Sequence, residues 1–133
     1  MHALLRSFLI AAAALSTGIA FADDCPPSDH SPMCEDARAQ ATYERADGEL
    51  NAAYQSLLKR MSKPSEAELD YPALKTRFIQ AQRQWLRFRD DECAAWYVIN
   101  QAGTERNADK LACLTERTQD RSRQLQAWSA ALP

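Results

Sequence analysis

Apolar residues recur at alternating steps of four and three along most of the chain after residue 34, which is the spacing of one face of an α-helix. The first such pattern contains no Pro and ends before Lys63-Pro64, where the proline ring cannot continue a helix. We therefore expect a long amphipathic helix from about residue 35 to residue 61. Its spaced positions are Tyr43, Asp47, Leu50, Tyr54, Leu57 and Met61, of which only Asp47 is polar.

Two further patterns with the same spacing follow, and residues 100–104 separate them. Gly103 breaks the helix there, and Thr104 is expected to cap the next one. The second pattern is Leu74, Phe78, Ala81, Trp85, Phe88, Glu92, Ala95 and Ile99, and the third is Leu111, Leu114, Thr118, Arg121, Leu125, Trp128 and Leu132. The chain is therefore predicted to be all-α, with three long antiparallel helices packed as a bundle.

Residues 1–22 have the pattern of a signal peptide. Arg6 lies in a short basic start, residues 8–15 are apolar, and Ala20-Phe21-Ala22 forms an A-x-A cleavage site. We expect cleavage before Asp23 and a single domain over residues 23–133. The acidic residues directly before Cys25 are atypical of a lipoprotein, so no membrane anchor is expected. The predicted location is periplasmic or secreted.

Composition narrows the classes of function. The chain has 133 residues, only three Gly and a formal net charge of −2. So few glycines argue against a glycine-rich nucleotide-binding loop, and a nucleic-acid partner would require a basic excess. Arg83, Arg87 and Arg89 lie close together, but acidic residues 90–92 follow them directly. We expect no nucleic-acid partner.

The chain contains four cysteines: Cys25, Cys34, Cys93 and Cys113. If the chain is exported, these cysteines are expected to form disulfides, because an oxidising compartment favours such bonds. They contain no C-x-x-C pair, and His30 is the only histidine outside the signal segment. A metal site is therefore not expected, and no cofactor is expected either. Two disulfides are predicted.

The pairing of these cysteines follows from the turn between the second and third helices. In an antiparallel helix pair, residues equally far from the turn lie at the same height. Cys93 and Cys113 each lie ten residues from Gly103, so we expect them to be bonded to each other. Cys25 is then left to pair with Cys34. A bond between Cys34 and Cys93 remains an alternative if the first helix lies close to the second.

Polar residues interrupt the apolar faces of all three helices at similar heights. They are Asp47, Asn51, Arg89, Asp90, Glu92, Thr118 and Arg121. We interpret them as a structural layer of ion pairs and hydrogen bonds that fixes the register of the helices, because buried charges must be partnered. A ligand pocket is the alternative. Neighbouring arginines would keep the carboxylates ionised and unfit as general acids, so no catalytic residue is predicted and the chain is not expected to be an enzyme.

Three blocks of sequence resemble the LprI-type lysozyme-inhibitor family. The blocks are Asp47-x-x-Leu50-Asn51-x-x-Tyr54, then Ala81-Gln82-Arg83-x-Trp85-x-x-Phe88-Arg89-Asp90-x-x-Cys93, then Cys113-Leu114-Thr115 with Arg117 and Arg121. The tryptophan-to-cysteine block is the specific part. The resemblance implies a small exported bacterial helical protein, with lysozyme as a possible protein partner, and no matched residue is assigned to inhibition.

Two functions from different classes follow. The first is an inhibitor that binds lysozyme and blocks its cleft with a loop, for which segments 62–72 and 101–107 are the candidates. The second is a general cell-envelope interaction or stress module unrelated to lysozyme, which an exposed apolar patch at Trp96-Tyr97 or Trp128 would favour. The sequence leaves the oligomeric state open.

Overall fold

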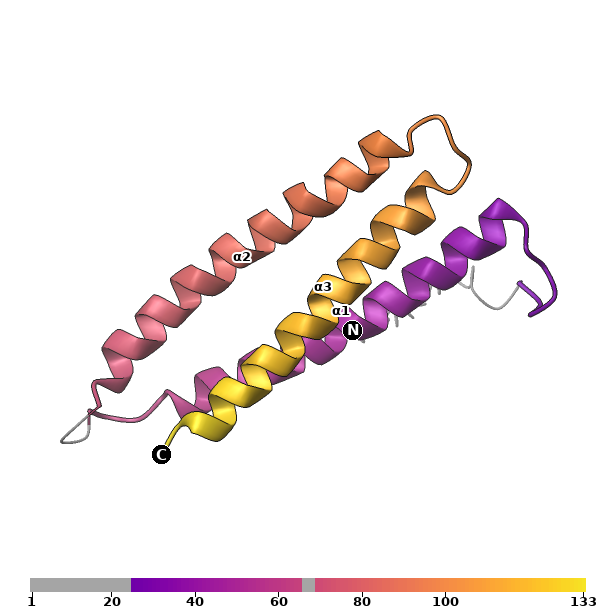
Figure 1. Cartoon of the computed structure of the whole chain (residues 1–133). Helices are drawn as coiled ribbons and strands as arrows, with labels where there is room; N and C mark the ends of the chain where they lie inside the picture. Colours follow the sequence, from indigo (N-terminus) through magenta and orange to yellow (C-terminus); the bar gives the residue numbers. More distant parts are fainter. Residues whose placement is uncertain (1–24, 66–68) are drawn as a thin grey trace, which may run out of the picture.

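A computed structural model of the chain describes residues 25–65 and 69–133, and the segment predicted to be a signal peptide lies outside these residues. Three α-helices form the fold: α1 (Pro32–Arg60), α2 (Tyr71–Ile99) and α3 (Arg106–Ala131). The described part of the chain contains no β-strand. Figure 1 shows that α2 runs opposite to α1 and α3. The prediction of an all-α fold with three long helices is confirmed.

Local sequence explains where α1 and α2 begin. The hydroxyl of Ser31 accepts a hydrogen bond from the backbone N–H of Cys34, and the following proline suits the first turn of α1. Asp70 caps α2 in the same way by accepting a hydrogen bond from the N–H of Ala73 at 3.0 Å. Helix α3 begins after Glu105 without a side-chain cap, so the expectation that Thr104 caps it is wrong.

Helix α3 is the centre of the packing. Its backbone lies close to α1 over many positions and to α2 over fewer, while the backbones of α1 and α2 rarely approach each other. The larger core cluster lies toward the α1–α2 connection, and its buried members are Leu50, Leu57, Met61, Tyr71, Phe78 and Leu125. A smaller cluster of Cys93, Cys113 and Leu114 lies toward the α2–α3 connection. Helix α2 thus depends mainly on one neighbour.

The predicted apolar face of α2 is buried only in part: Phe78 is buried and Leu74 and Trp85 pack against the core, but later positions of the face are exposed. Phe88 and Ile99 belong to the predicted pattern, yet they are 60% and 70% exposed. The buried positions after Phe78 are instead Gln82, Arg89 and Cys93. Gln82 and Arg89 can be buried because partners on the neighbouring helices satisfy their polar groups. Since α2 packs mainly on α3, the later part of the predicted stripe, with Phe88 and Ile99, lies beside the interface rather than in it.

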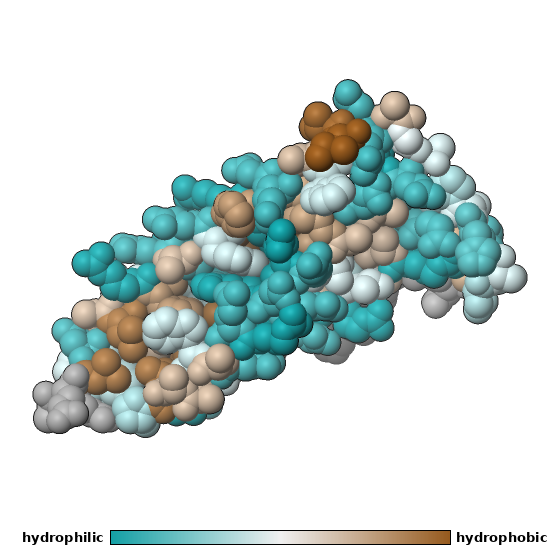
Figure 2. Space-filling model, in the orientation of Figure 1, coloured by the Kyte–Doolittle hydropathy of each residue, from teal (hydrophilic) through white to brown (hydrophobic). Residues whose placement is uncertain are grey.

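Apolar side chains also gather on the surface where α2 ends. Figure 2 shows a strongly hydrophobic group at this end of the molecule, above a predominantly hydrophilic middle. The exposed large apolar residues of this segment are Trp96, Tyr97, Val98 and Ile99. We call residues 96–105, which join this end of α2 to the loop before α3, the tip. The tip is the most hydrophobic projecting part of the described chain.

Candidate functional site

A disulfide lies at the base of the tip. Cys93 on α2 is bonded to Cys113 on α3, with 5.5 Å between the two Cα atoms. Both residues are buried, so the bond fixes the separation of the two helices where the connecting loop begins. Equal distance from Gly103 predicts this pairing, and the alternative bond between Cys34 and Cys93 is not formed.

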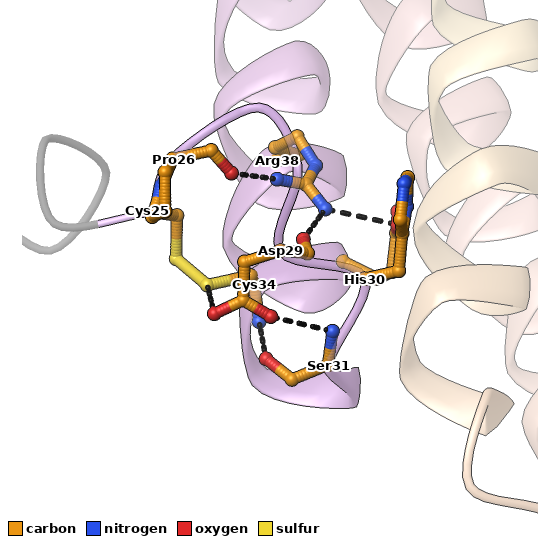
Figure 3. Close-up of a disulfide and its surroundings, with 8 residues drawn as sticks. Cys25, Pro26, Asp29, His30, Ser31, Cys34 and Arg38 are labelled. Carbon is orange, nitrogen blue, oxygen red and sulfur yellow. Dashed lines mark hydrogen bonds and ion pairs between the residues drawn. A yellow bond between two sulfur atoms is a disulfide. The ribbon is translucent and has the colours of Figure 1, made fainter.

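The second disulfide, between Cys25 and Cys34, holds the segment that precedes α1 (Figure 3). Arg38 reaches back from α1 and donates hydrogen bonds to the carbonyl oxygens of Pro26 and Asp29. The Asp29 carboxylate accepts a hydrogen bond from the backbone N–H of Ser31 at 2.8 Å, and this bond lowers the pKa of Asp29. The segment is therefore fixed by a covalent bond and by charge-assisted hydrogen bonds together.

The carboxylate of Glu35 completes this N-terminal arrangement. It accepts hydrogen bonds from His30 at 3.0 Å and from Arg38 at 2.9 Å, and these two bonds lower its pKa. Because an ionised carboxylate accepts both bonds, the arrangement is stable where Glu35 is charged.

Four residues of the predicted polar layer converge around Arg89. Its guanidinium contacts the carboxylates of Asp90 at 2.8 Å and Asp47 at 3.5 Å. It also donates a hydrogen bond to the buried hydroxyl of Thr118 at 3.1 Å. Asn51 donates to Asp47 at 3.0 Å, which holds that carboxylate in place from within α1. The cluster joins all three helices.

Aromatic rings enclose the Arg89 guanidinium. It lies 5.7 Å from the ring centroid of Tyr43 and 5.3 Å from that of Trp85, both within the range of cation–π attraction. Burial raises the pKa of the Tyr43 hydroxyl. Arg89 is 5% exposed, so this charge is almost fully removed from water and depends on the contacts just described.

The remaining two residues of the predicted layer lie elsewhere. Glu92 accepts two hydrogen bonds from Arg117, at 2.8 and 3.0 Å, and this pairing raises the pKa of Arg117. Arg121 donates to the amide oxygens of Gln82 and Gln124, each at 2.9 Å, and burial lowers its pKa. The predicted single layer is therefore two groups, one around Arg89 and one in the groove between α2 and α3.

Sequence reasoning missed Gln82 and Gln124 as members of these groups. Gln82 lies seven residues before Arg89 and eleven before Cys93, which is the spacing of a single helix face. A search for polar residues at that spacing would have found it. Apolar periodicity overlooks it because a buried amide resembles a surface residue in any hydropathy pattern.

Two properties of the described residues bear on the kind of site. None of the helices in residues 25–65 and 69–133 is both long and apolar enough to span a bilayer. Within the same residues, no three His, Cys, Asp or Glu side chains gather as a metal site.

These features define a small three-helix protein module stabilised by two disulfides. The family described as lysozyme inhibitor LprI matches residues 28–125, and the chain belongs to this family. The resemblance inferred from the three sequence blocks is thus confirmed. Comparisons with curated proteins and with solved structures found no match.

Proposed function

We propose that this protein binds lysozyme and inhibits it by placing the tip in the substrate cleft of the enzyme. Membership of the lysozyme inhibitor LprI family supports lysozyme as the partner. The tip is chosen as the segment that enters the cleft because it exposes apolar surface next to a buried disulfide. A segment that blocks a cleft must both project and keep its shape.

The tip meets both requirements. Residues 101–105 are all exposed, so the loop projects beyond the helices. The Cys93–Cys113 bond holds its two ends together, and the side-chain amide of Asn100 donates to the carboxylate of Asp109 at 2.7 Å across the loop. A loop that is already ordered loses little conformational entropy on binding. Val98 and Ile99 supply the apolar surface that a hydrophobic contact needs.

Charge adds a smaller contribution. The chain has a formal net charge of −2 and an isoelectric point near 5.7. An acidic inhibitor and a basic enzyme attract each other at long range, which raises the association rate more than the final affinity. We therefore expect salt to slow association while leaving the apolar contact at the tip intact.

The test is a cell-wall clearing assay with a purified animal lysozyme. The wild-type protein is expected to slow clearing in a saturable manner. A variant carrying Val98→Ser and Ile99→Ser is expected to require at least about tenfold more protein for the same inhibition, because it loses the apolar contact. Calorimetric titration of the two proteins measures the same difference as an affinity.

Met33→Ser provides the matched control. Met33 is a 75% exposed apolar residue on α1 outside the tip, so Met33→Ser removes exposed apolar surface without changing the tip. Inhibition equal to the wild type is expected from this control. Lysozyme binding without inhibition would contradict cleft blocking, and the absence of both binding and inhibition would contradict lysozyme as the partner.

A second function is favoured by the same exposed patch. Trp96 and Tyr97 are exposed at the end of α2, as an envelope interaction module would require, and Trp128 is exposed on α3. Under this alternative the tip binds another envelope protein. Cross-linking from position 98 in envelope extract, with and without added lysozyme, separates the two functions, since only the first predicts that lysozyme competes for the cross-link.

We further propose that the chain is exported and cleaved before Asp23, with residues 23–133 as one domain. Two disulfides support export because such bonds persist in oxidising compartments. Intact-mass spectrometry of the exported protein tests the cleavage site. A different first residue, or an acyl mass on Cys25, would contradict this proposal.

A further inference from the structure

Helices α2 and α3 line an open hollow of about 300 Å³ that contains no residue of the tip. Trp85 and Phe88 form the α2 wall, and Arg121 and Gln124 lie on the α3 wall. The hollow includes Phe88, an apolar residue of the predicted α2 stripe that the bundle leaves exposed. It is independent of the tip and therefore of the proposed lysozyme contact.

The acidic groups of the hollow already have cationic partners. Glu92 forms its two hydrogen bonds with Arg117, and Asp120 is paired with Arg123. Their charges are thus balanced, while their remaining lone pairs can still accept hydrogen bonds. The two pairs leave one cation of the hollow, Arg121, uncompensated.

Arg121 has only neutral partners among the described residues. Its hydrogen bonds go to the amide oxygens of Gln82 and Gln124, and no carboxylate of residues 25–65 or 69–133 lies within ion-pair distance of it. Its guanidinium lies 5.5 Å from the ring centroid of Trp85, in a partly desolvated place. A guanidinium has five N–H donors, so several remain free for an anion. A desolvated cation without a counter-ion gains free energy when a carboxylate binds it.

Phe88 supplies a flat apolar surface beside this cation. Its ring is 60% exposed, and it makes no aromatic or cation–π contact with the residues that the structure describes. An exposed ring face of this kind stacks on the C–H face of a sugar ring. The accepting oxygens of Glu92 and Asp120 suit the hydroxyl groups around the rim of such a ring.

We propose that the hollow between α2 and α3 binds a pyranose that carries a carboxylate. The carboxylate pairs with Arg121, the ring stacks on Phe88, and the hydroxyls donate to Glu92 and Asp120 while the Gln124 amide binds the rim. A purely aromatic acid would offer no hydroxyl donors to the remaining lone pairs of the Glu92 and Asp120 oxygens. A neutral sugar would leave Arg121 without an anion. A sugar acid offers both an anion for Arg121 and an apolar ring face for Phe88.

The test is an NMR titration of the whole protein with matched pairs of sugars. D-Glucuronate and D-glucose differ only in the carboxylate at C6. N-acetylmuramic acid and N-acetylglucosamine differ only in the lactyl ether at C3, which carries the carboxylate. We expect saturable shifts of the Trp85 indole N–H and the Arg121 Nε–H with at least one acid, and at least about tenfold weaker binding of its neutral twin. The preferred acid reveals which position of the carboxylate the hollow recognises.

Substitutions locate the binding. Arg121→Gln is expected to weaken binding of the acid at least about tenfold and to bring it to the level of the neutral sugar. Arg83→Gln is the matched control, because Arg83 is an exposed arginine of α2 outside the hollow. This variant should bind the acid with the same affinity as the wild-type protein. Phe88→Ser, at an exposed position that the fold does not need, is expected to weaken acid and neutral sugar alike.

Three outcomes would overturn the proposal. They are equal affinity for the acids and their neutral twins, binding of acetate as tight as that of either sugar acid, and the absence of saturable shifts with all four sugars. Should Arg121→Gln not fold by circular dichroism, Arg121→Lys replaces it. Lysine keeps the charge but loses the planar fork of donors, so this variant is expected to weaken binding of the acid and to leave that of the neutral sugar unchanged. Undiminished binding by Phe88→Ser would exclude stacking and contradict the proposed site.

Discussion

The guanidinium of Arg89 lies 3.5 Å from the carboxylate of Asp47 and thereby connects α2 to α1, two helices whose backbones rarely approach each other. The same guanidinium donates to the hydroxyl of Thr118 on α3. One arginine thus contacts all three helices. The arrangement supports the interpretation of Arg89 as a residue of the fold.

Arg89→Ala is expected to lower the free energy of unfolding by about 3 kcal/mol, because it removes a buried side chain and leaves the Thr118 hydroxyl without its donor. The Asp90 side chain is 59% exposed, so Asp90→Ala should cost less than about 1 kcal/mol. Urea unfolding measures both values. Arg87→Ala is the control, since Arg87 is exposed two residues away. Wild-type stability of Arg89→Ala together with lost binding would mean that Arg89 is a recognition residue.

Removing the Cys93–Cys113 bond by Cys→Ser substitution at both positions is expected to cost about 3 kcal/mol on the chain-entropy argument for a loop of this length. The same change at Cys25 and Cys34 should cost less, because the segment before α1 can open locally without exposing the main core. Thermal unfolding of the two double variants gives the comparison. Equal losses would contradict the local opening of the N-terminal segment.

Gly48→Ala is expected to stabilise the protein by about 0.5 to 1 kcal/mol, because alanine restricts the unfolded chain and favours the helix interior. Gly48 lies within α1, and a Cβ added there would meet no atom within 4 Å. At Gly103 a Cβ would lie 3.3 Å from the carbonyl oxygen of Asn100, so Gly103→Ala should give no gain. Chemical denaturation of the two variants distinguishes the sites. A loss of stability in Gly48→Ala would show that the added methyl group meets other atoms, contrary to this expectation.

The N-terminal segment is expected to loosen in acid. The pKa values of Asp29 and Glu35 are lowered below their ordinary values of 3.8 and 4.5, so the unfolded chain binds protons more readily than the folded one. Their contribution to stability is therefore complete above pH 4.5 and is lost as the pH falls through the folded pKa values. Amide exchange of Cys34 and its neighbours, followed by NMR as a function of pH, measures this loss. Asp29→Asn should flatten the profile, and an unchanged profile in that variant would exclude Asp29 as a cause.

Hydrophobic periodicity predicted the helices well and the buried face of α2 poorly. Leu50 and Leu57 lie at spaced positions of α1, and they are buried as expected because apolar side chains face two neighbouring segments there. In α2 the pattern through Phe88 and Ile99 is offset from the face that is buried. The reason is physical, since Gln82 and Arg89 are buried through hydrogen bonds, which a hydropathy pattern does not register.

The disulfide at the base of the tip can be predicted from the sequence, because the number of residues between each cysteine and the turn is known from the chain itself. The partner of a long charged side chain cannot be predicted in this way. The sequence predicts Glu92 and Arg121 in the same layer as Arg89, yet Glu92 pairs with Arg117, and Arg121 pairs with two amides. Choosing among several arginines and carboxylates within reach requires the rotation of each helix, and the sequence leaves that rotation undetermined.

Covalent closure at Cys93 and Cys113 has a consequence for how the protein tolerates change. The main core, which contains Leu57 and Leu125, lies at the opposite end of the helices from the tip. Substitutions or insertions within residues 100–105 therefore do not reach that core, and the bond below them keeps the two helix ends together. The three-helix bundle can thus stay constant while the loop of residues 100–105 is exchanged. A foreign peptide inserted into this loop would be displayed with both of its ends held by the helices.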